Sequence, residues 1–335
     1  HRATMGRGDD AGGTQMAMQV AVAVGTVAVG ALYWLMRSSK SSGKEKKVFL
    51  DKSKKQSVPL SEKIQLSHDT YLFRFSLPTP DHVLGLPVGK HFKIFGKIPT
   101  PTVKNQWNGR EDSEQIDPSH DELVERKYTP TSSDEELGYF DLVIKVYRPG
   151  HMYNPPRDKF PDGGKISRYI DSLKVGDLLE IQGPFGHIEY LGKGVFKSFA
   201  KELEPVKEIG MIAGGTGITP MLQIINAVLR DKSDTTKIRL LFANQTKEDI
   251  LLMDKLEELR EANKSQVKIY YTLDKPPKDW KGFTGFVTEA MLAETMPSAS
   301  SKSIVLMCGP PPMIDFAVRP NLDKLGFSKY QMLAF

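Results

Sequence analysis

Cysteine is almost absent from this sequence, since Cys308 is the only one in 335 residues. A single thiol excludes an intramolecular disulfide, which suits a reducing compartment. The sequence shows no Cys–His–Asn arrangement that would indicate Cys308 as a nucleophile. We therefore interpret Cys308 as a packing residue.

A strong charge of one sign is also missing: 46 Lys and Arg residues are balanced by 41 Asp and Glu residues, for a net charge of +5. Proteins that bind nucleic acid concentrate basic residues in one patch, so this mild excess gives no reason to expect a nucleic-acid partner. No metal site is expected. The length accommodates two packed domains, and no internal repeat is apparent.

Charge is missing altogether between Met16 and Met36, at the end of the N-terminal tail 1–36. A helix needs about 20 apolar residues to cross a bilayer, and Tyr33 and Trp34 suit the membrane–water interface. The linker 37–47 that follows is rich in Lys, which predicts that the C-terminal side lies in the cytosol. We therefore predict a transmembrane anchor over 16–36. A cleaved signal peptide and a buried helix are the alternatives, although the run is long for a signal peptide.

The segment 48–196 is predicted to be rich in antiparallel strands. Short apolar runs such as YLFRFSL, HVLGLPVGKHFKIFG and YFDLVIKVYRPG alternate with Pro and Gly turns, which is typical of a barrel or sheet. A short helix is expected near Lys165 to Leu173. The stretch 97–125 is acidic and poor in apolar residues, which predicts an exposed loop that is either a decorated hairpin of no consequence or a partner-selecting element.

The segment 197–335 has a different sequence pattern, in which apolar strands are predicted to alternate with helices. EIGMIAGG, IRLLFANQ, VKIYYTLD and IVLMCGPPP read as strands, while ITPMLQIINAVLRD and a charged stretch from about Lys247 to Ala262 read as helices. This alternation predicts a parallel, doubly wound sheet.

Two turns in this second segment are candidate ligand sites. The run from Gly214 to Pro220 follows an apolar strand and opens a helix, as a phosphate-binding turn requires, although tight strand–helix packing alone would also explain it. Pro220 stands where the last glycine of the dinucleotide fingerprint belongs. The run from Cys308 to Met313 carries successive prolines, which fix the backbone and supply no N–H donors. We therefore expect it to form a wall of the binding site rather than to bind phosphate.

The first segment carries two further candidates. Arg126 and Tyr128 share one face of an expected strand, so a guanidinium would grip a pyrophosphate while the ring packs on a flat heterocycle. The run from Asp162 to Ser167 supplies an anion-binding turn ahead of the short helix. Alone, either could be an ordinary surface feature.

In this order the motifs resemble the NADH-cytochrome b5 reductase family, within the wider ferredoxin-NADP reductase-like flavoenzymes, from about Val48 to Phe335. The resemblance implies an N-terminal transmembrane helix followed by an antiparallel β-barrel FAD-binding domain (48–196) and an α/β Rossmann-like NADH-binding domain (197–335). The implied reaction is hydride transfer from NADH to FAD, then single electrons to cytochrome b5 or a similar haem protein, in support of membrane lipid metabolism such as desaturation.

The resemblance also assigns roles to individual residues. Arg126 would hold the FAD pyrophosphate, Thr219 would lie near the flavin ring, Cys308 would lie beside the nicotinamide, and Asp274 would disfavour the 2′-phosphate of NADPH. The implied catalytic residues are Thr219, Cys308 and Lys145, the last of which would also help to hold NADH. The implied cofactor-binding residues are Arg126, Tyr128, Thr129, Pro130, Val143, Ile144, Lys145, Tyr147, Gly163, Gly164, Lys165, Ile166, Ser167, Gly214, Gly215, Thr216, Gly217, Thr219, Pro220, Asp274, Cys308, Gly309, Pro310 and Met313. Lys127 replaces a proline that is common in the flavin motif, and Arg168 stands where glutamine is more usual.

Several partner expectations remain open at this point. A monomer is expected, held to membrane lipid of the endoplasmic reticulum or the outer mitochondrial membrane, with basic residues such as Lys165 steering an acidic haem protein. His68 and His91 are possible proton carriers, but His91 is expected to pack near the barrel. One alternative is a flavin module similar to that of nitrate reductase, which GPFGHIEY resembles; another is a membrane scaffold that has lost its cofactors.

Overall fold

The computed structural model describes residues 46–97, 106–107, 110–111, 123–148 and 163–335. The predicted membrane span, nearly all of the basic linker and most of the acidic loop lie outside these ranges. Within them, no helix combines the length and the apolarity that crossing a bilayer requires. The residues from Lys47 to Phe335 form one compact unit.

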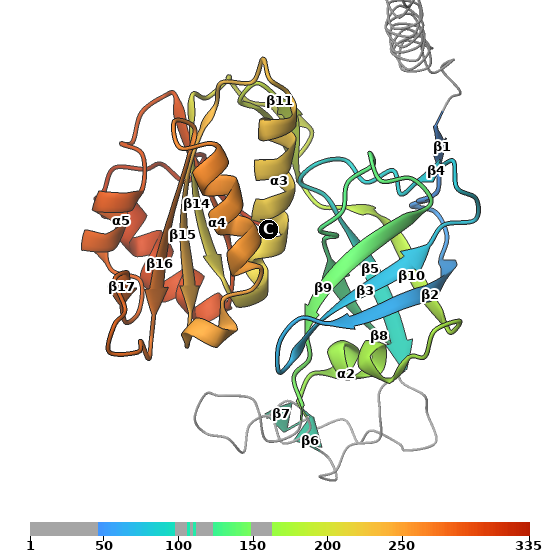
Figure 1. The fold of residues 1–335 in the computed structure, drawn as a ribbon. Helices are drawn as coiled ribbons and strands as arrows, with labels where there is room; N and C mark the ends of the chain where they lie inside the picture. Colours follow the sequence, from blue (N-terminus) through green and yellow to red (C-terminus); the bar gives the residue numbers. More distant parts are fainter. Residues whose placement is uncertain (1–45, 98–105, 108–109, 112–122, 149–162) are drawn as a thin grey trace, which may run out of the picture. The chain divides into compact units, whose positions relative to one another are not determined.

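The first part of this unit is an antiparallel barrel (Figure 1). Its six strands have the order β8-β5-β10-β2-β3-β9. Their bounds are β2 Gln56–Gln65, β3 Thr70–Ser76, β5 His91–Lys97, β8 Leu123–Tyr128, β9 Tyr139–Lys145 and β10 Leu178–Phe185. Alternate side chains point inward, so Phe73 and Phe75 of β3 are fully buried, and Phe75 stacks on Phe140 of β9 with ring centroids 5.4 Å apart. The predicted antiparallel barrel is confirmed.

The short helix α2 (Lys165–Ser172) closes one end of the barrel, as Figure 1 shows. It forms where the sequence predicts it because Ile166 and Ile170, four residues apart, present one apolar face to the barrel core. Gly96 allows the close approach, since a Cβ there would lie 2.3 Å from the Tyr169 ring. Two minor sheets join β1 (Lys47–Val48) to β4 (His82–Val83) and β6 (Gln106–Trp107) to β7 (Arg110–Glu111).

The second part is a parallel six-stranded sheet with the order β17-β16-β15-β14-β18-β19. Its strands are β14 Glu208–Gly214, β15 Lys237–Asn244, β16 Val267–Leu273, β17 Phe283–Thr284, β18 Ser303–Cys308 and β19 Met332–Ala334. The chain runs outward from β14 first through β15 and β16 and later through β18 and β19. The strand order therefore reverses between β14 and β18, and in open α/β sheets ligands bind at the carboxyl ends of strands at such a point.

Helices cover both faces of this sheet, which explains why its strands are apolar runs rather than alternating ones. One face packs on α3 (Ile218–Arg230) and α4 (Met253–Ala262), and the other on α5 (Glu289–Thr295), the π-helical turn η4 (Met313–Val318) and α6 (Arg319–Lys324). The helix expected over 247–262 is interrupted. A 3₁₀ turn, η3 (Lys247–Asp249), precedes α4, and Leu252 between them has a left-handed φ of 56°.

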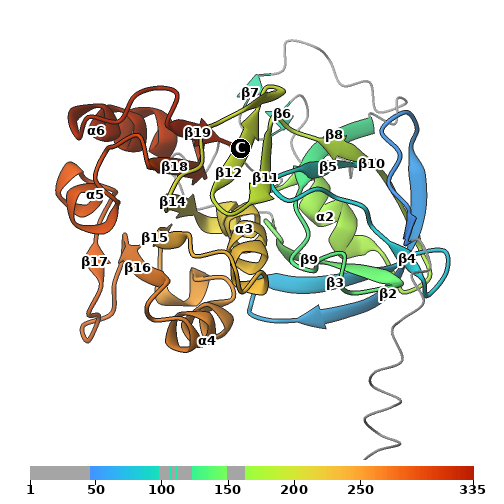
Figure 2. The ribbon, with the colours of Figure 1, turned by 90° about the horizontal axis from the view of Figure 1, so that it is seen from above.

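A three-stranded sheet links the two parts and was not predicted. It consists of β11 (Ile188–Gly192), β12 (Val195–Ser198) and β13 (Lys201–Glu202). In both views β11 lies beside α3 (Figure 2), and Ile188, Tyr190 and Phe196 belong to the same core cluster as α3. The strand β12 thus runs across the predicted domain boundary at 196.

Candidate functional site

A cavity of about 540 Å³ separates the barrel from the carboxyl ends of β14 and β18. Sites for small molecules and cofactors commonly measure about 300–1,000 Å³. The barrel wall consists of His91, Arg126, Lys127, Tyr128, Thr129, Val143, Ile144, Lys145, Tyr147, Gly164, Lys165, Ile166 and Ser167. The facing wall consists of Gly214, Gly215, Thr216, Gly217, Thr219, Pro220, Cys308, Gly309, Pro310 and Phe335. Most of the predicted site residues, from distant parts of the sequence, therefore line one cavity.

Strand β8 brings Arg126 and Tyr128 to this cavity. Arg126 is exposed, and its Nη1 donates to the carbonyl of Glu125 at 2.8 Å, so the rest of the guanidinium can meet an anion. Burial raises the pKa of Tyr128 well above its usual value, so the phenol stays neutral and presents a flat ring. A cation beside a neutral ring is suited to a phosphate joined to a planar heterocycle.

The turn before α2 supplies backbone N–H groups to the same wall. Gly163 has a φ of 72°, and a Cβ there would lie 2.2 Å from the carbonyl of Tyr147. At Gly164, the N-cap of α2, a Cβ would lie 2.4 Å from Ser167 Oγ. No side chain caps this N-terminus, and the N–H of Gly164 donates to the carbonyl of Tyr147 at 2.8 Å. The positive end of the helix dipole favours an anion at this point.

Lys145, at the end of β9, ties the two halves of the site together. Its Nζ lies 3.0 Å from Asp69 of the barrel and forms a short ion pair with Asp249 of η3. Burial alone would lower the pKa of Lys145, but the hydrogen bonds to Asp249 and Asp69 outweigh it and raise the pKa. Asp249 also accepts from the N–H and the hydroxyl of Thr246, so one carboxylate joins the nucleotide-side loop to the barrel.

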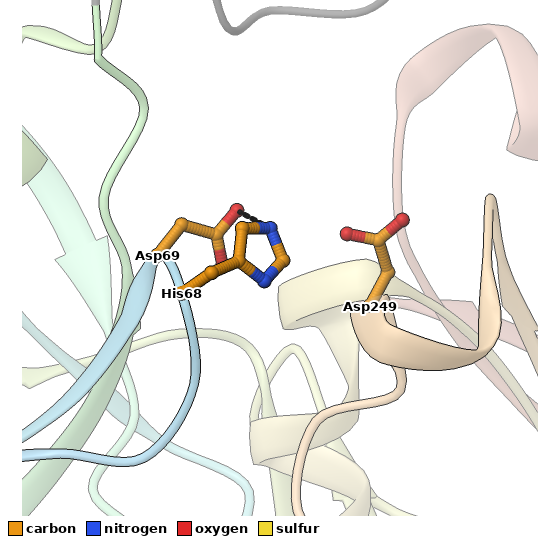
Figure 3. A group of neighbouring side chains, drawn as sticks. All are labelled: His68, Asp69 and Asp249. Carbon is orange, nitrogen blue, oxygen red and sulfur yellow. Dashed lines mark ion pairs between the residues drawn. The ribbon is translucent and has the colours of Figure 1, made fainter.

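His68, Asp69 and Asp249 have ligand atoms within 4.8 Å of one another (Figure 3). The ammonium of Lys145 forms ion pairs with both carboxylates. His68 Nε2 lies 3.2 Å from Asp69. We therefore interpret the group as an ion-pair cluster rather than a metal site.

The facing wall is built by close backbone packing of the two predicted turns. A Cβ on Gly217 would lie 2.1 Å from the carbonyl oxygen of Cys308, and one on Gly214 would lie 2.8 Å from Pro310 Cδ. Gly215 has a φ of 52° with nothing within 4 Å of its Cβ position, so it faces open space. The two turns are therefore in contact, and together they frame one binding surface at the point where the strand order reverses.

Cys308 ends β18 on this surface. Burial raises the pKa of its thiol to about 11, and Lys127 across the cavity partly opposes the shift. The thiol is thus protonated at neutral pH, which agrees with a packing residue and not with a thiolate nucleophile. Thr219 donates its hydroxyl to the carbonyl of Thr216 at 3.2 Å, which holds the first turn of α3.

Four predicted residues do not line the cavity. Met313 lies behind its wall against Gly214 and Gly309, and Gly163 directly precedes the lining residues. Pro130 lines a smaller, separate cavity of about 100 Å³. Asp274 follows the end of β16, where its N–H donates to the carbonyl of Asn244 and burial raises the pKa of its carboxyl group.

Three lining residues were not predicted to belong to the site: His91, Lys127 and Phe335. Lys127 lies between the two predicted residues of β8, so its position in the motif was the available signal. His91 was expected to pack near the barrel; burial lowers its pKa to about 4, with further contributions from Lys127 and Lys93. Phe335 reaches the cavity because β19 pairs with β18 and its N–H donates to Met307, a long-range contact with no local signal.

Comparisons with known proteins agree with this division of the site. The oxidoreductase FAD-binding domain family matches residues 57–117 and 114–190, and the oxidoreductase NAD-binding domain family matches residues 211–319. The first covers the barrel and the second covers the parallel sheet up to η4.

Individual relatives cover most of the chain. NADH-cytochrome b5 reductase 2 of Gallus gallus is 47% identical over 85% of this chain and 87% of its own length. NADH-cytochrome b5 reductase 1 of Homo sapiens is 49% identical over 84% and 85%. Among solved structures, the cytochrome b5 reductase domain of Ulva prolifera nitrate reductase is 42% identical, covers 86% of this chain and all of its own, and superposes with a TM-score of 0.75.

Proposed function

Because the chain belongs to the NADH-cytochrome b5 reductase family, we propose that it transfers electrons from NADH, through bound FAD, to cytochrome b5. The observation that carries this proposal is the single cavity on which the barrel and the nucleotide turns converge. The flavin supplies the conversion of a two-electron hydride donor into one-electron steps that haem iron accepts.

The barrel wall fits the FAD. Arg126, Lys165 and the α2 N-terminus offer positive charge and N–H donors to a pyrophosphate, while the glycines before α2 leave the backbone accessible. Tyr128 offers an uncharged ring to a flat heterocycle. We assign Thr129 to the same heterocycle, because it follows Tyr128 on this wall.

The facing wall fits NADH. The Gly214–Gly217 turn accepts a dinucleotide because its backbone is bare, and the neutral Cys308 thiol and Pro310 exclude water beside the nicotinamide without placing charge there. Thr219, fixed by Thr216, positions the nicotinamide edge. Lys145 would hold the ribose or phosphate from the barrel side, while Asp249 orients its ammonium.

The proposal is tested on the full chain by recording its visible spectrum anaerobically before and after one equivalent of NADH. A yellow protein that NADH bleaches fast and NADPH bleaches slowly is the expected result. Asp274→Ala should speed the reaction with NADPH, since a carboxylate repels the 2′-phosphate. A colourless protein that cannot take up FAD would contradict the proposal and favour the scaffold.

The identity of the acceptor has a second candidate. The structural similarity to a nitrate reductase domain favours a flavin module that can serve another acceptor. Reduction of cytochrome b5 and of alternative haem proteins by the same enzyme, compared as kcat/KM, separates the two, and cytochrome b5 should be preferred.

We also propose that the protein is a monomer anchored in a membrane by 16–36, with its catalytic part in the cytosol and a role in membrane lipid metabolism. The uncharged run followed by basic residues supports the anchor and its orientation. Endoplasmic reticulum and outer mitochondrial membrane are the two candidate locations. Resistance of the full chain to alkaline carbonate extraction from membranes is the expected result, and release into the supernatant would contradict the anchor.

A further inference from the structure

The hairpin that joins β12 to β13 has an unusual turn. Ser198 pairs with Lys201, so Phe199 and Ala200 alone form the loop. Their φ values are 46° and 66°, both left-handed. Two-residue hairpin loops with two positive φ values strongly prefer Asn-Gly or Gly-Gly, and a bulky side chain in this region is costly. The chain thus keeps a large aromatic residue where the backbone favours a small one.

The side chain of Phe199 does not pack into the protein to compensate. It is 77% exposed, and its ring lies flat on that of His187, with centroids 4.2 Å apart and an interplanar angle of 14°. The N–H of Phe199 donates to the carbonyl of His187 at 3.1 Å, which fixes the tip of the hairpin. The result is a rigid aromatic group presented to the solvent.

The hairpin tip adjoins the rim of the cofactor cavity. His187 follows Gly186, where a Cβ would lie 3.2 Å from Nδ1 of His91, and His91 lines the cavity. Lys90 lies beside His187, because its Nζ donates to the carbonyl of the preceding residue, Gly186, at 3.0 Å. Burial lowers the pKa of His187, and the charges of Lys127 and Lys90 lower it further. Phe199 therefore lies near the cavity rim, since it stacks on His187 and the adjacent Gly186 approaches His91 closely.

Three lysines lie along this rim, which we call the basic rim and define as Lys90, Lys93 and Lys127. Lys93 and Lys127 are directly opposite each other on β5 and β8, an arrangement that normally destabilises a sheet. Lys93 pairs with Glu125 at 2.5 Å. Lys90 donates to the carbonyl of Gly186 at 3.0 Å and pairs with Glu189 at 3.6 Å. Lys127 is exposed and has no ion-pair partner within the ranges that the structure describes. The net positive charge of the basic rim therefore comes from Lys127.

A strained, exposed aromatic group beside unpaired positive charge, at the edge of the cavity from which electrons must leave, is costly to the isolated protein. We propose that Phe199 is the apolar anchor of the docking surface for the acceptor, and that the basic rim receives the acidic face of that haem protein. This inference rests on the proposed function. It adds Lys127 to Lys165, the steering residue that the sequence suggested, and both line the barrel wall of the cavity.

The salt dependence of docking distinguishes an apolar anchor from purely electrostatic steering. Electron-transfer complexes have small interfaces, and aromatic residues are enriched among the few that carry most of the binding energy. Loss of Phe199 should therefore weaken docking at every salt concentration. Loss of a rim lysine should weaken it mainly at low salt, because screening removes the contribution of exposed charges.

The test uses the full chain with its FAD, NADH as donor, and the soluble haem domain of cytochrome b5 as acceptor. Phe199→Asn removes the ring while Asn tolerates the left-handed φ, and Phe199→Gly is a second variant that the turn accommodates. Phe199→Tyr keeps the ring. Tyr330→Asn is the matched control, because Tyr330 is 74% exposed but lies just before β19, in the parallel-sheet part. Ferricyanide, which needs no protein docking, reports the cofactor site in each variant.

We expect Phe199→Asn and Phe199→Gly to raise the KM for the haem domain on the order of tenfold, at both low and high salt. Phe199→Tyr and Tyr330→Asn should stay within about twofold of the unchanged enzyme. An unchanged KM in both Phe199 variants, an equal loss in Tyr330→Asn, or an equal loss with ferricyanide would each overturn the anchor. If the unchanged enzyme fails to reduce ferricyanide with NADH, the proposed function itself fails, and the anchor fails with it.

Discussion

The two walls of the cavity differ in the kind of group that they offer. The barrel wall contributes basic side chains, including Arg126, Lys127, Lys145 and Lys165, whereas the facing wall contributes no charged side chain at all among its described lining residues. The facing wall is instead made of bare backbone at Gly214–Gly217 and of neutral side chains such as Cys308. One wall selects its ligand by charge and the other by shape.

This difference suits a resident cofactor and an exchangeable one. Charge-assisted hydrogen bonds from several directions favour tight retention of a diphosphate, which is what a resident FAD requires. A neutral turn that depends on close backbone approach recognises a dinucleotide while holding it less strongly, so NAD⁺ can leave after each turnover. The predictions below test this division from the largest expected effect to the smallest.

Gly217→Ala should have the largest effect. Its Cβ would lie 2.1 Å from the carbonyl oxygen of Cys308, so the two turns must separate, and a shift of about 1 Å in a reacting group costs roughly 100-fold in rate. We expect kcat/KM for NADH to fall by about that factor while the flavin absorbance remains, since the barrel wall is untouched.

Gly215→Ala is the matched control for Gly217→Ala. Its φ of 52° also disfavours a side chain, but nothing lies within 4 Å of the Cβ position. We therefore expect only the left-handed penalty of about 1–2 kcal/mol in stability and a small effect on NADH oxidation. Equal losses in the two variants would contradict a specific role for contact between the turns, because Gly217 itself has an ordinary helical φ of −62°.

Arg126→Ala should release FAD. Hydrogen bonds to charged groups contribute about 1.5–3 kcal/mol, so the FAD dissociation constant should rise roughly tenfold to 100-fold, measured by flavin fluorescence on dilution. Arg126→Lys keeps the charge but loses the planar guanidinium. Its FAD dissociation constant should therefore lie between those of the unchanged protein and Arg126→Ala. Unchanged FAD retention in Arg126→Ala would contradict the assignment of charge-based binding to the barrel wall.

The sequence predicted the facing wall more completely than the connections around it. Apolar strands that end in glycine or proline turns place Gly214 and Cys308 at adjacent strand ends by local rules alone. The β11–β13 sheet and the position of Phe335 depend on pairing between distant segments, for which the sequence holds no periodic signal. The helix expected over 247–262 overlooked Leu252, whose left-handed backbone lets η3 turn Asp249 toward Lys145.

Asp249→Asn should have a moderate effect on the KM for NADH, because it breaks the ion pair that joins the nucleotide-side loop to Lys145 of the barrel. The matched variant Asp69→Asn removes the partner of Lys145 within the barrel itself. We expect Asp249→Asn to raise the KM for NADH several-fold and Asp69→Asn to raise it less, since only the first releases the nucleotide-side loop. Equal KM values in the two variants would contradict a coupling role for Asp249.

The same ion pair predicts a pH dependence. Burial acts to raise the pKa of Asp249, but Lys145 and Thr246 outweigh it, so the pKa lies below its usual value of 3.8. The contribution of Asp249 to stability is therefore lost as pH falls through that lowered value. The pKa of Lys145 lies above its usual value of 10.5, so its contribution to stability is lost only as pH rises through the raised value. Thermal midpoints of the unchanged protein and Asp249→Asn should therefore differ by a constant amount between about pH 5 and pH 10 and converge at the acidic end.

Alkylation of Cys308 should leave the cofactor site unaltered until the thiol has reacted, and its rate tests the neutrality of the facing wall directly. With a pKa of about 11, the thiol should react with iodoacetamide at pH 7.5 roughly 100-fold or more slowly than a free cysteine of pKa about 8.5, because only the thiolate reacts. The rate should rise about tenfold per pH unit toward pH 11. Lys127→Met should slow the reaction further, since Lys127 is the charge that lowers this pKa from across the cavity. A fast reaction at neutral pH that Lys127→Met does not alter would mean that charge on the barrel wall does not reach the nicotinamide side, and that the two walls act independently.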